Sequence, residues 1–126
     1  METMEAMVKR VISDYPDLML QKAQFERHLS QRENPDMRDA LTMLWVKIHT
    51  VENWFALLEA DERFVLRQMI SEKQSEPAAQ NAALMWICQA CNMEKTPLQI
   101  RKNVIAKITA FAEMHKETML AIFTEH

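Results

Sequence analysis

Residues 87–112, ICQACNMEKTPLQIRKNVIAKITAFA, decide how the rest of the chain is interpreted. A short apolar segment breaks near Asn92, a residue type that tolerates the left-handed backbone of a tight turn. A new helix is then predicted, because Thr96 is suited to its N-cap and Pro97 to its first position. Gln99, three residues after Thr96, completes a T-x-x-Q capping box. The stretch therefore predicts two helices joined by a tight turn, which is a helix-turn-helix.

The helix that begins after Thr96 is predicted to bury one side. Apolar positions recur every three or four residues, which is the spacing of one helix face. That face comprises Ile100, Val104, Ile108, Phe111 and His115. A single final helix is expected from Pro97 almost to the C-terminus, because the chain stays apolar through Met114, Met119, Ile122 and Phe123. Its tail is expected to dock on the N-terminal helices or to form a dimer contact.

The opposite side of this helix carries groups that can read DNA. Amides, a cation and a small side chain can approach base edges in a major groove. The residues concerned are Gln99, Lys102, Asn103 and Ala106. The predicted DNA-binding set also includes Thr96 at the helix start and three cations suited to phosphates, Lys95, Arg101 and Lys107.

The charge distribution supports the same interpretation. Residues 95–107 contain four cations and no acidic residue, whereas the whole chain has a net charge of −3, which leaves −7 for the remainder. A positive spot on an acidic molecule favours a phosphate-binding surface, although an ordinary solvated helix face has the same composition. The capping and turn chemistry just upstream favours DNA.

The composition predicts an all-α fold. The 126 residues include no glycine and only four prolines, and the tight turns of β-rich folds favour glycine. An apolar content of 48% and a charged content of 26% are those of a globular protein with a core. The N-terminus lacks a signal-peptide pattern and no apolar run can cross a bilayer, so a cytosolic protein is expected.

Residues 1–58 are predicted to form a helical hairpin, or coiled-coil arm. The first helix reaches Gln31 and is interrupted or bent at Tyr15-Pro16, because proline disfavours helix in the residue before it. Asn34 as cap and Pro35 as first residue mark the start of a long second helix. Its apolar stripe comprises Leu41, Leu44, Ile48, Val51, Phe55 and Leu58.

Eleven methionines and three tryptophans suggest an adaptable core, with a partner-facing patch as the alternative for some of them. Trp45 and Trp54 lie beside the stripe of the second helix. Both are assigned to the core, because large aromatic side chains are usually buried, and a partner contact remains the alternative.

Residues 59–126 are predicted to form one compact unit. A short helix is expected to begin near Ala60 and to end near Ser71, before a polar linker. Residues 78–91 are rich in alanine and other small residues, which suits the first helix of a helix-turn-helix because small side chains let two helices cross closely.

The order of these parts resembles a known family of regulators. Residues 51–70, VENWFALLEADERFVLRQMI, look like the start of a sigma factor region 4, and residues 8–26, VKRVISDYPDLMLQKAQFE, look like the family's arm. The helix-turn-helix resembles the S-x-x-T-x-Y-R-W-R-x-x-I-V-x-x-I-A pattern of phage late-transcription regulators of the RinA and ArpU type. The matching positions are Thr96, Leu98, Gln99, Ile100, Arg101, Val104, Ile105 and Ile108.

The resemblance implies a DNA-binding transcription regulator of phage or mobile-element origin, with a sigma region 4-like helix-turn-helix, that activates late or packaging genes. Double-stranded promoter or operator DNA is the implied partner, with RNA polymerase as a second contact, in the cytoplasm of a bacterial host cell. A homodimer is expected, because a second copy supplies a second half-site.

Enzymatic chemistry is not expected. Cys88 and Cys91 have the spacing of a redox pair or half a zinc site, but no second pair follows, and packing is the simpler role. The four histidines are scattered, and His115 is assigned to the buried face. A glycine-rich phosphate loop is impossible without glycine, and no nucleophile-base set is recognisable. No cofactor or metal is therefore expected.

A second hypothesis from a different class remains open. A helical protein-interaction module, such as an antirepressor, an inhibitor or a polymerase adaptor, can keep the shape of a helix-turn-helix without contacting DNA. The acidic remainder of the chain and its Met- and Trp-rich arm favour this alternative.

Overall fold

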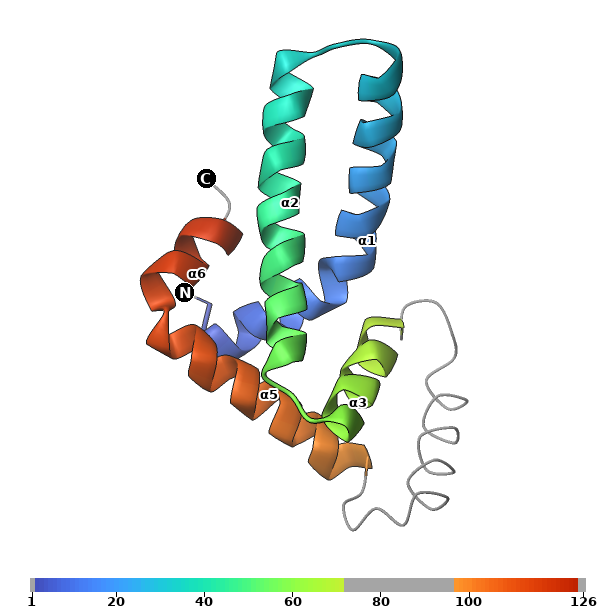
Figure 1. The fold of residues 1–126 in the computed structure, drawn as a ribbon. Coiled ribbons are helices and arrows are strands. Elements are labelled where there is room, and N and C mark those ends of the chain that lie inside the picture. Colours follow the sequence, from blue (N-terminus) through green and yellow to red (C-terminus); the bar gives the residue numbers. More distant parts are fainter. Residues whose placement is uncertain (1, 72–96, 125–126) are drawn as a thin grey trace.

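The structure is a computed structural model, and it describes residues 2–71 and 97–124. Within these residues the chain forms five helices and no strand, which confirms the predicted all-α class. The helices are α1 (Met4–Gln31), α2 (Pro35–Ala56), α3 (Ala60–Ser71), α5 (Pro97–Met114) and α6 (Lys116–Phe123), as labelled in Figure 1. No helix of the described part is both long and apolar enough to cross a membrane.

The helix α1 begins at a side-chain cap and bends near a proline. Thr3 Oγ1 accepts a hydrogen bond from the backbone N–H of Ala6 at 3.1 Å, which satisfies one donor of the first turn. Pro16 lies inside α1, and Figure 1 shows the helix changing direction without ending. Of the two outcomes expected at Tyr15-Pro16, the structure has the bend.

The helix α2 starts as predicted. Asn34 Oδ1 accepts a hydrogen bond from the backbone N–H of Met37 at 3.2 Å, and Pro35 occupies the first turn. The helices α1 and α2 lie side by side and antiparallel, and they project away from the other helices (Figure 1). The outer part of this pair, residues 17–52, is shorter than the predicted arm of residues 1–58. We use the name arm for residues 17–52.

One core lies at the base of the arm, where all five described helices contribute. The helix α5 supplies its centre, because Ile100, Val104 and Ile108 are completely buried. Trp54 of α2 is also completely buried, and its ring centroid lies 5.8 Å from that of Phe123 in α6. Buried side chains therefore come from both predicted parts, 1–58 and 59–126, and pack together.

The prediction of one continuous final helix is wrong. The helix breaks at His115, which is exposed, whereas the pattern had placed it on the buried face. The ring of His115 instead lies against Phe111, with centroids 4.6 Å apart. The break lets α6 change direction, so that Met119 and Phe123 return to the core. A straight continuation of α5 would have carried these two side chains past it.

The assignment of the two tryptophans of α2 is half right. Trp54 is in the core as predicted, but Trp45 has 43% of its surface exposed. Two helices packed side by side bury one stripe each, and Trp45 follows the buried Leu44 by about 100° around the helix. Lys22 of α1 covers part of the Trp45 ring, with Nζ 4.9 Å from its centroid.

We predict that Ile108→Ala destabilises the protein by about 2–5 kcal/mol, because it deletes fully buried side-chain volume at the centre of the core. Leu98→Ala is the matched control on the same helix, since Leu98 is 62% exposed and its loss is expected to cost about 0.5 kcal/mol or less. Urea denaturation followed by circular dichroism measures both. Equal losses in the two variants would contradict the described packing of α5.

Candidate nucleic-acid interface

The outward side of α5 carries part of the predicted DNA-binding set. Gln99, Lys102 and Ala106 are exposed, and Asn103 beside them is half-buried. These positions fall within about 100° of one another around the helix, so they share one side. The opposite side is anchored in the core. The buried side of α5 therefore fixes the orientation of its outward side.

Other members of the predicted set are not brought to that side, or cannot be placed. Lys95 and Thr96 lie outside the described residues, as do residues 78–91, which were predicted to form the first helix of the helix-turn-helix. Arg101 follows Gln99 by about 200° around α5, so it projects from nearly the opposite side. Its side chain is half-buried, and its Nε atom is fully buried. The structure thus separates Arg101 from Gln99.

Lys107 forms an ion pair with a buried acid. Its Nζ lies 2.6 Å from Oε1 of Glu62 in α3, and the Glu62 side chain is only 6% exposed. The same Glu62 oxygen accepts a hydrogen bond from the backbone N–H of Glu59 at 3.0 Å. Because Glu62 is the third residue of α3, this bond has the geometry by which a helix caps its own start. A single carboxylate oxygen therefore caps α3 and ties it to α5.

The surroundings of Lys107 are acidic. The hydrogen bond to Glu62 raises the pKa of Lys107, partial desolvation opposes it, and the charges of Glu62, Glu59 and Asp61 raise it further. Ligand oxygens of these three acids all lie within 4.8 Å of one another. Since the ammonium group of Lys107 already contacts this cluster, we interpret the three acids as an ion-pair partner of Lys107 and not as a metal site. It also lowers the electrostatic potential along one edge of α5.

The sequence indicated only half of this arrangement. The acidic pair Asp61-Glu62 is typical of a helix start, where carboxylates favour the positive end of the helix dipole. Lys107 was assigned to phosphates because it flanks the residues that are predicted to reach base edges. The contact that joins them spans 45 residues, and no local pattern reports a contact of that range.

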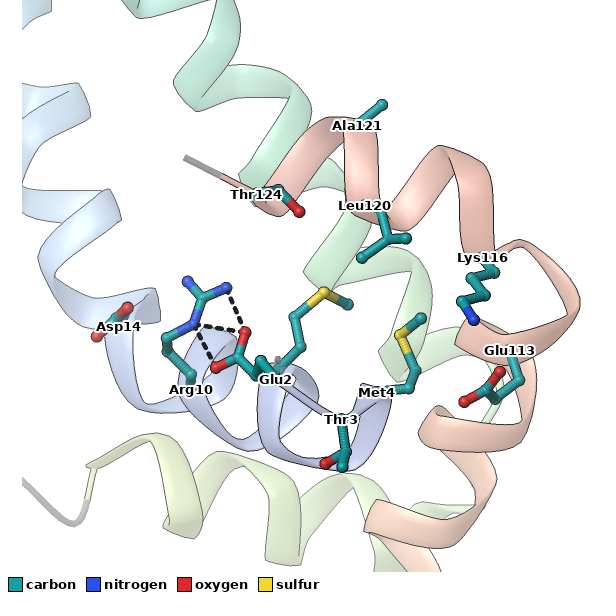
Figure 2. Close-up of a pocket in the computed structure, with 11 residues that line it drawn as sticks. Glu2, Thr3, Met4, Arg10, Asp14, Glu113, Lys116, Leu120, Ala121 and Thr124 are labelled. Carbon is teal, nitrogen blue, oxygen red and sulfur yellow. Dashed lines mark hydrogen bonds and ion pairs between the residues drawn. The ribbon is translucent and has the colours of Figure 1, made fainter. Parts of the chain in front are cut away.

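A pocket lies between the start of α1 and the α5–α6 corner (Figure 2). Its volume is about 990 Å³, which is within the range of small-molecule pockets. Arg10 projects into it and forms hydrogen bonds to both carboxylate oxygens of Glu2, from Nε and Nη2 at 3.0 Å each. Nη2 also donates to the carbonyl oxygen of Phe123 at 3.1 Å. The charged groups therefore bind one another and join α1 to α6.

The pocket is lined by apolar and charged side chains from both ends of the chain. The hydrogen bonds from Arg10 lower the pKa of Glu2, so the pair stays charged under neutral conditions. The apolar lining comes mainly from Met4, Met7 and Leu120, and the remaining charges come from Asp14, Glu113 and Lys116. A pocket lined by apolar side chains and by charges of both signs does not define a single class of ligand.

Comparison of the chain with known protein families, with curated proteins and with solved structures found no match.

We predict that Lys107→Met lowers the stability of the fold, because it leaves the buried carboxylate of Glu62 without its cation. Lys102→Met is the matched control, since Lys102 lies on the exposed side of the same helix. The midpoint of urea denaturation is expected to fall for Lys107→Met and to change little for Lys102→Met.

The pH dependence of the same pair has a defined sign. The pKa of Lys107 in the folded protein is raised above its ordinary value of 10.5, so its contribution is complete below that pH and is lost as the pH rises through the folded value. The stability difference between the unmodified protein and Lys107→Met should therefore stay constant up to about pH 10 and shrink as the pH is raised above 10.5. A difference that does not shrink above that pH would contradict the role of the ion pair.

Proposed function

We propose that this protein is a DNA-binding transcription regulator in which α5 is the recognition helix. The observation that carries the proposal is the outward side of α5, where Gln99 and Lys102 are exposed while Ile100, Val104 and Ile108 are completely buried. A helix with one side fixed in a core and the other in solvent is what insertion into a major groove requires.

The chemistry of this side fits the edges of base pairs. The Gln99 amide can both donate to and accept from adenine, and Lys102 can donate to guanine or to a phosphate. Ala106 is small enough to let the helix approach closely and can contact a thymine methyl group. Asn103 lies at the edge of this side and supplies a second amide.

Lys107 can take part without leaving Glu62. A lysine ammonium group has three N–H donors, and the contact with Glu62 uses one of them. The side chain is 46% exposed, so a phosphate oxygen can reach the remaining donors. In this proposal Glu62 positions Lys107 at the edge of the groove, while the neighbouring acids limit how strongly any one phosphate is held.

The particular class of regulator rests on the resemblance of the sequence to RinA- and ArpU-type proteins. On that basis we propose a phage or mobile-element regulator that activates late or packaging genes in the bacterial cytoplasm. Lys95, Thr96 and Arg101 belong to this proposed DNA-binding set, and RNA polymerase is the proposed second partner.

A helical protein-interaction module is the second candidate function. It is favoured by the acids Glu59, Asp61 and Glu62 beside α5, since negative charge repels phosphates. Such a module would bind a protein partner through α5 or the arm and would show no affinity for DNA at low salt.

We predict that the protein binds a random-sequence DNA duplex of about 30 base pairs at about 50 mM salt, with micromolar affinity that falls as salt rises. Lys102→Glu should weaken this binding roughly tenfold and reduce the salt slope by about one, because one phosphate-facing cation is reversed. Fluorescence anisotropy of labelled duplex measures both quantities.

Lys116→Glu, on α6, makes the same change in net charge away from the outward side of α5 and is the matched control. It should leave DNA affinity nearly unchanged, and circular dichroism should show unchanged helicity in both variants. Absence of binding at low salt would refute the DNA proposal and select the protein-interaction module. Equal weakening by the two substitutions would show that binding follows net charge and not α5.

A further inference from the structure

The two helices of the arm cover each other on one side only, and much of their remaining surface is exposed. In the part of α1 that belongs to the arm, no residue is buried, and the apolar residues that face α2 remain half-exposed: Leu18, Phe25 and Leu29. On the α2 side of the arm, Leu44, Ile48 and Val51 are buried. In a pair of helices, each helix buries only the stripe that faces its partner. In a four-helix bundle, each helix packs against two neighbours and buries more of its surface. The arm thus has the surface of an incomplete bundle.

One side of the arm combines apolar surface with charges that are already paired. Trp45 is 43% exposed and Met19 is 40% exposed. The contact of Lys22 with the Trp45 ring shows that the two helices meet on this side, and Met19 precedes Lys22 by three residues on the same helix face. We call this side the Trp45 face and define it by Met19, Lys22, Glu26, Trp45 and His49.

The ammonium and carboxylate groups of the Trp45 face are paired within one chain. Lys22 Nζ lies 3.0 Å from Oε1 of Glu26. The arm as a whole contains six acidic and five basic residues between positions 17 and 52, a net charge of −1. A strongly charged partner such as DNA gains little from this face, whereas a second copy is not repelled by it.

We propose that the Trp45 face is the surface through which two copies of this chain associate, completing a four-helix bundle between their arms. A two-fold axis brings the same patch of each copy into contact, and a nearly neutral patch with a central tryptophan suits such a self-complementary contact. This inference does not rest on the proposed DNA binding and specifies which surface forms the homodimer.

The size of the face predicts the strength of the contact. The 18 residues of α2 within the arm, 35–52, give a length of about 27 Å, and two adjacent helices are about 20 Å wide, so each copy offers roughly 500 Å². Two copies would bury about 1,000 Å², which is the size of a weak, transient interface. A micromolar dissociation constant is therefore expected, with monomers at low concentration.

The test compares two neighbouring residues of α1. Met19→Glu places a charge on the Trp45 face, whereas Leu20→Glu makes the same change at a residue that is 59% exposed and follows Met19 by about 100°. Since Leu20 precedes Lys22 by about 200°, it projects away from the Trp45 face. Trp45→Glu is the second variant on the face, and circular dichroism checks the fold of all three.

Sedimentation equilibrium in reducing buffer, from about 1 to about 200 µM, should show a monomer–dimer equilibrium for the unmodified chain. Met19→Glu and Trp45→Glu should each weaken it about tenfold or more, and Leu20→Glu should not. A chain that stays monomeric at every concentration overturns the proposal. So does a dimer that resists both face variants, or one that Leu20→Glu weakens equally.

Discussion

The burial of one side of α5 is the constraint on which the rest of this structure depends. Ile100, Val104 and Ile108 are completely buried, and the described helices α1, α3 and α6 all contact this helix. Because a helix with a continuous apolar stripe must cover it, the start of α1, the helix α3 and the turn into α6 are all arranged around α5. Gln99 and Lys102 then face outward as a consequence of the same periodicity.

Local sequence signals predicted what local physics controls. The Asn34-Pro35 start of α2, the bend near Pro16 and the buried stripe of α5 each follow from capping, proline geometry or helical periodicity. His115 was misplaced because it continues the same three-four spacing, and periodicity alone contains no signal for the point at which a helix breaks. Trp45 was misplaced for a related reason. Its size predicts burial, but the number of helices that surround the arm is a tertiary property.

In the candidate site, too, local sequence predicts some features and tertiary contacts decide the others. The outward side of α5 could be predicted, since it is the complement of an apolar stripe. The ion pair of Lys107 with Glu62 could not, because α3 and α5 are brought together only by the core that both help to build. A cationic run in the sequence therefore overstates the free positive charge of the folded surface. Arg101 gives a second example, as the helical repeat turns it away from Gln99.

The arm and α5 lie in different parts of the molecule, which restricts how a dimer could present two recognition helices (Figure 1). If two arms paired in opposite directions, the bases would lie at opposite ends of a bundle about 27 Å long, and the two copies of α5 would be separated by more than that length. Successive major grooves on one side of DNA are about 34 Å apart. If the two-fold axis instead ran along the arms, both bases would lie at one end. In both arrangements the arms set the spacing and direction of the two copies of α5, so the proposed dimer would fix the arrangement of half-sites that one duplex must present.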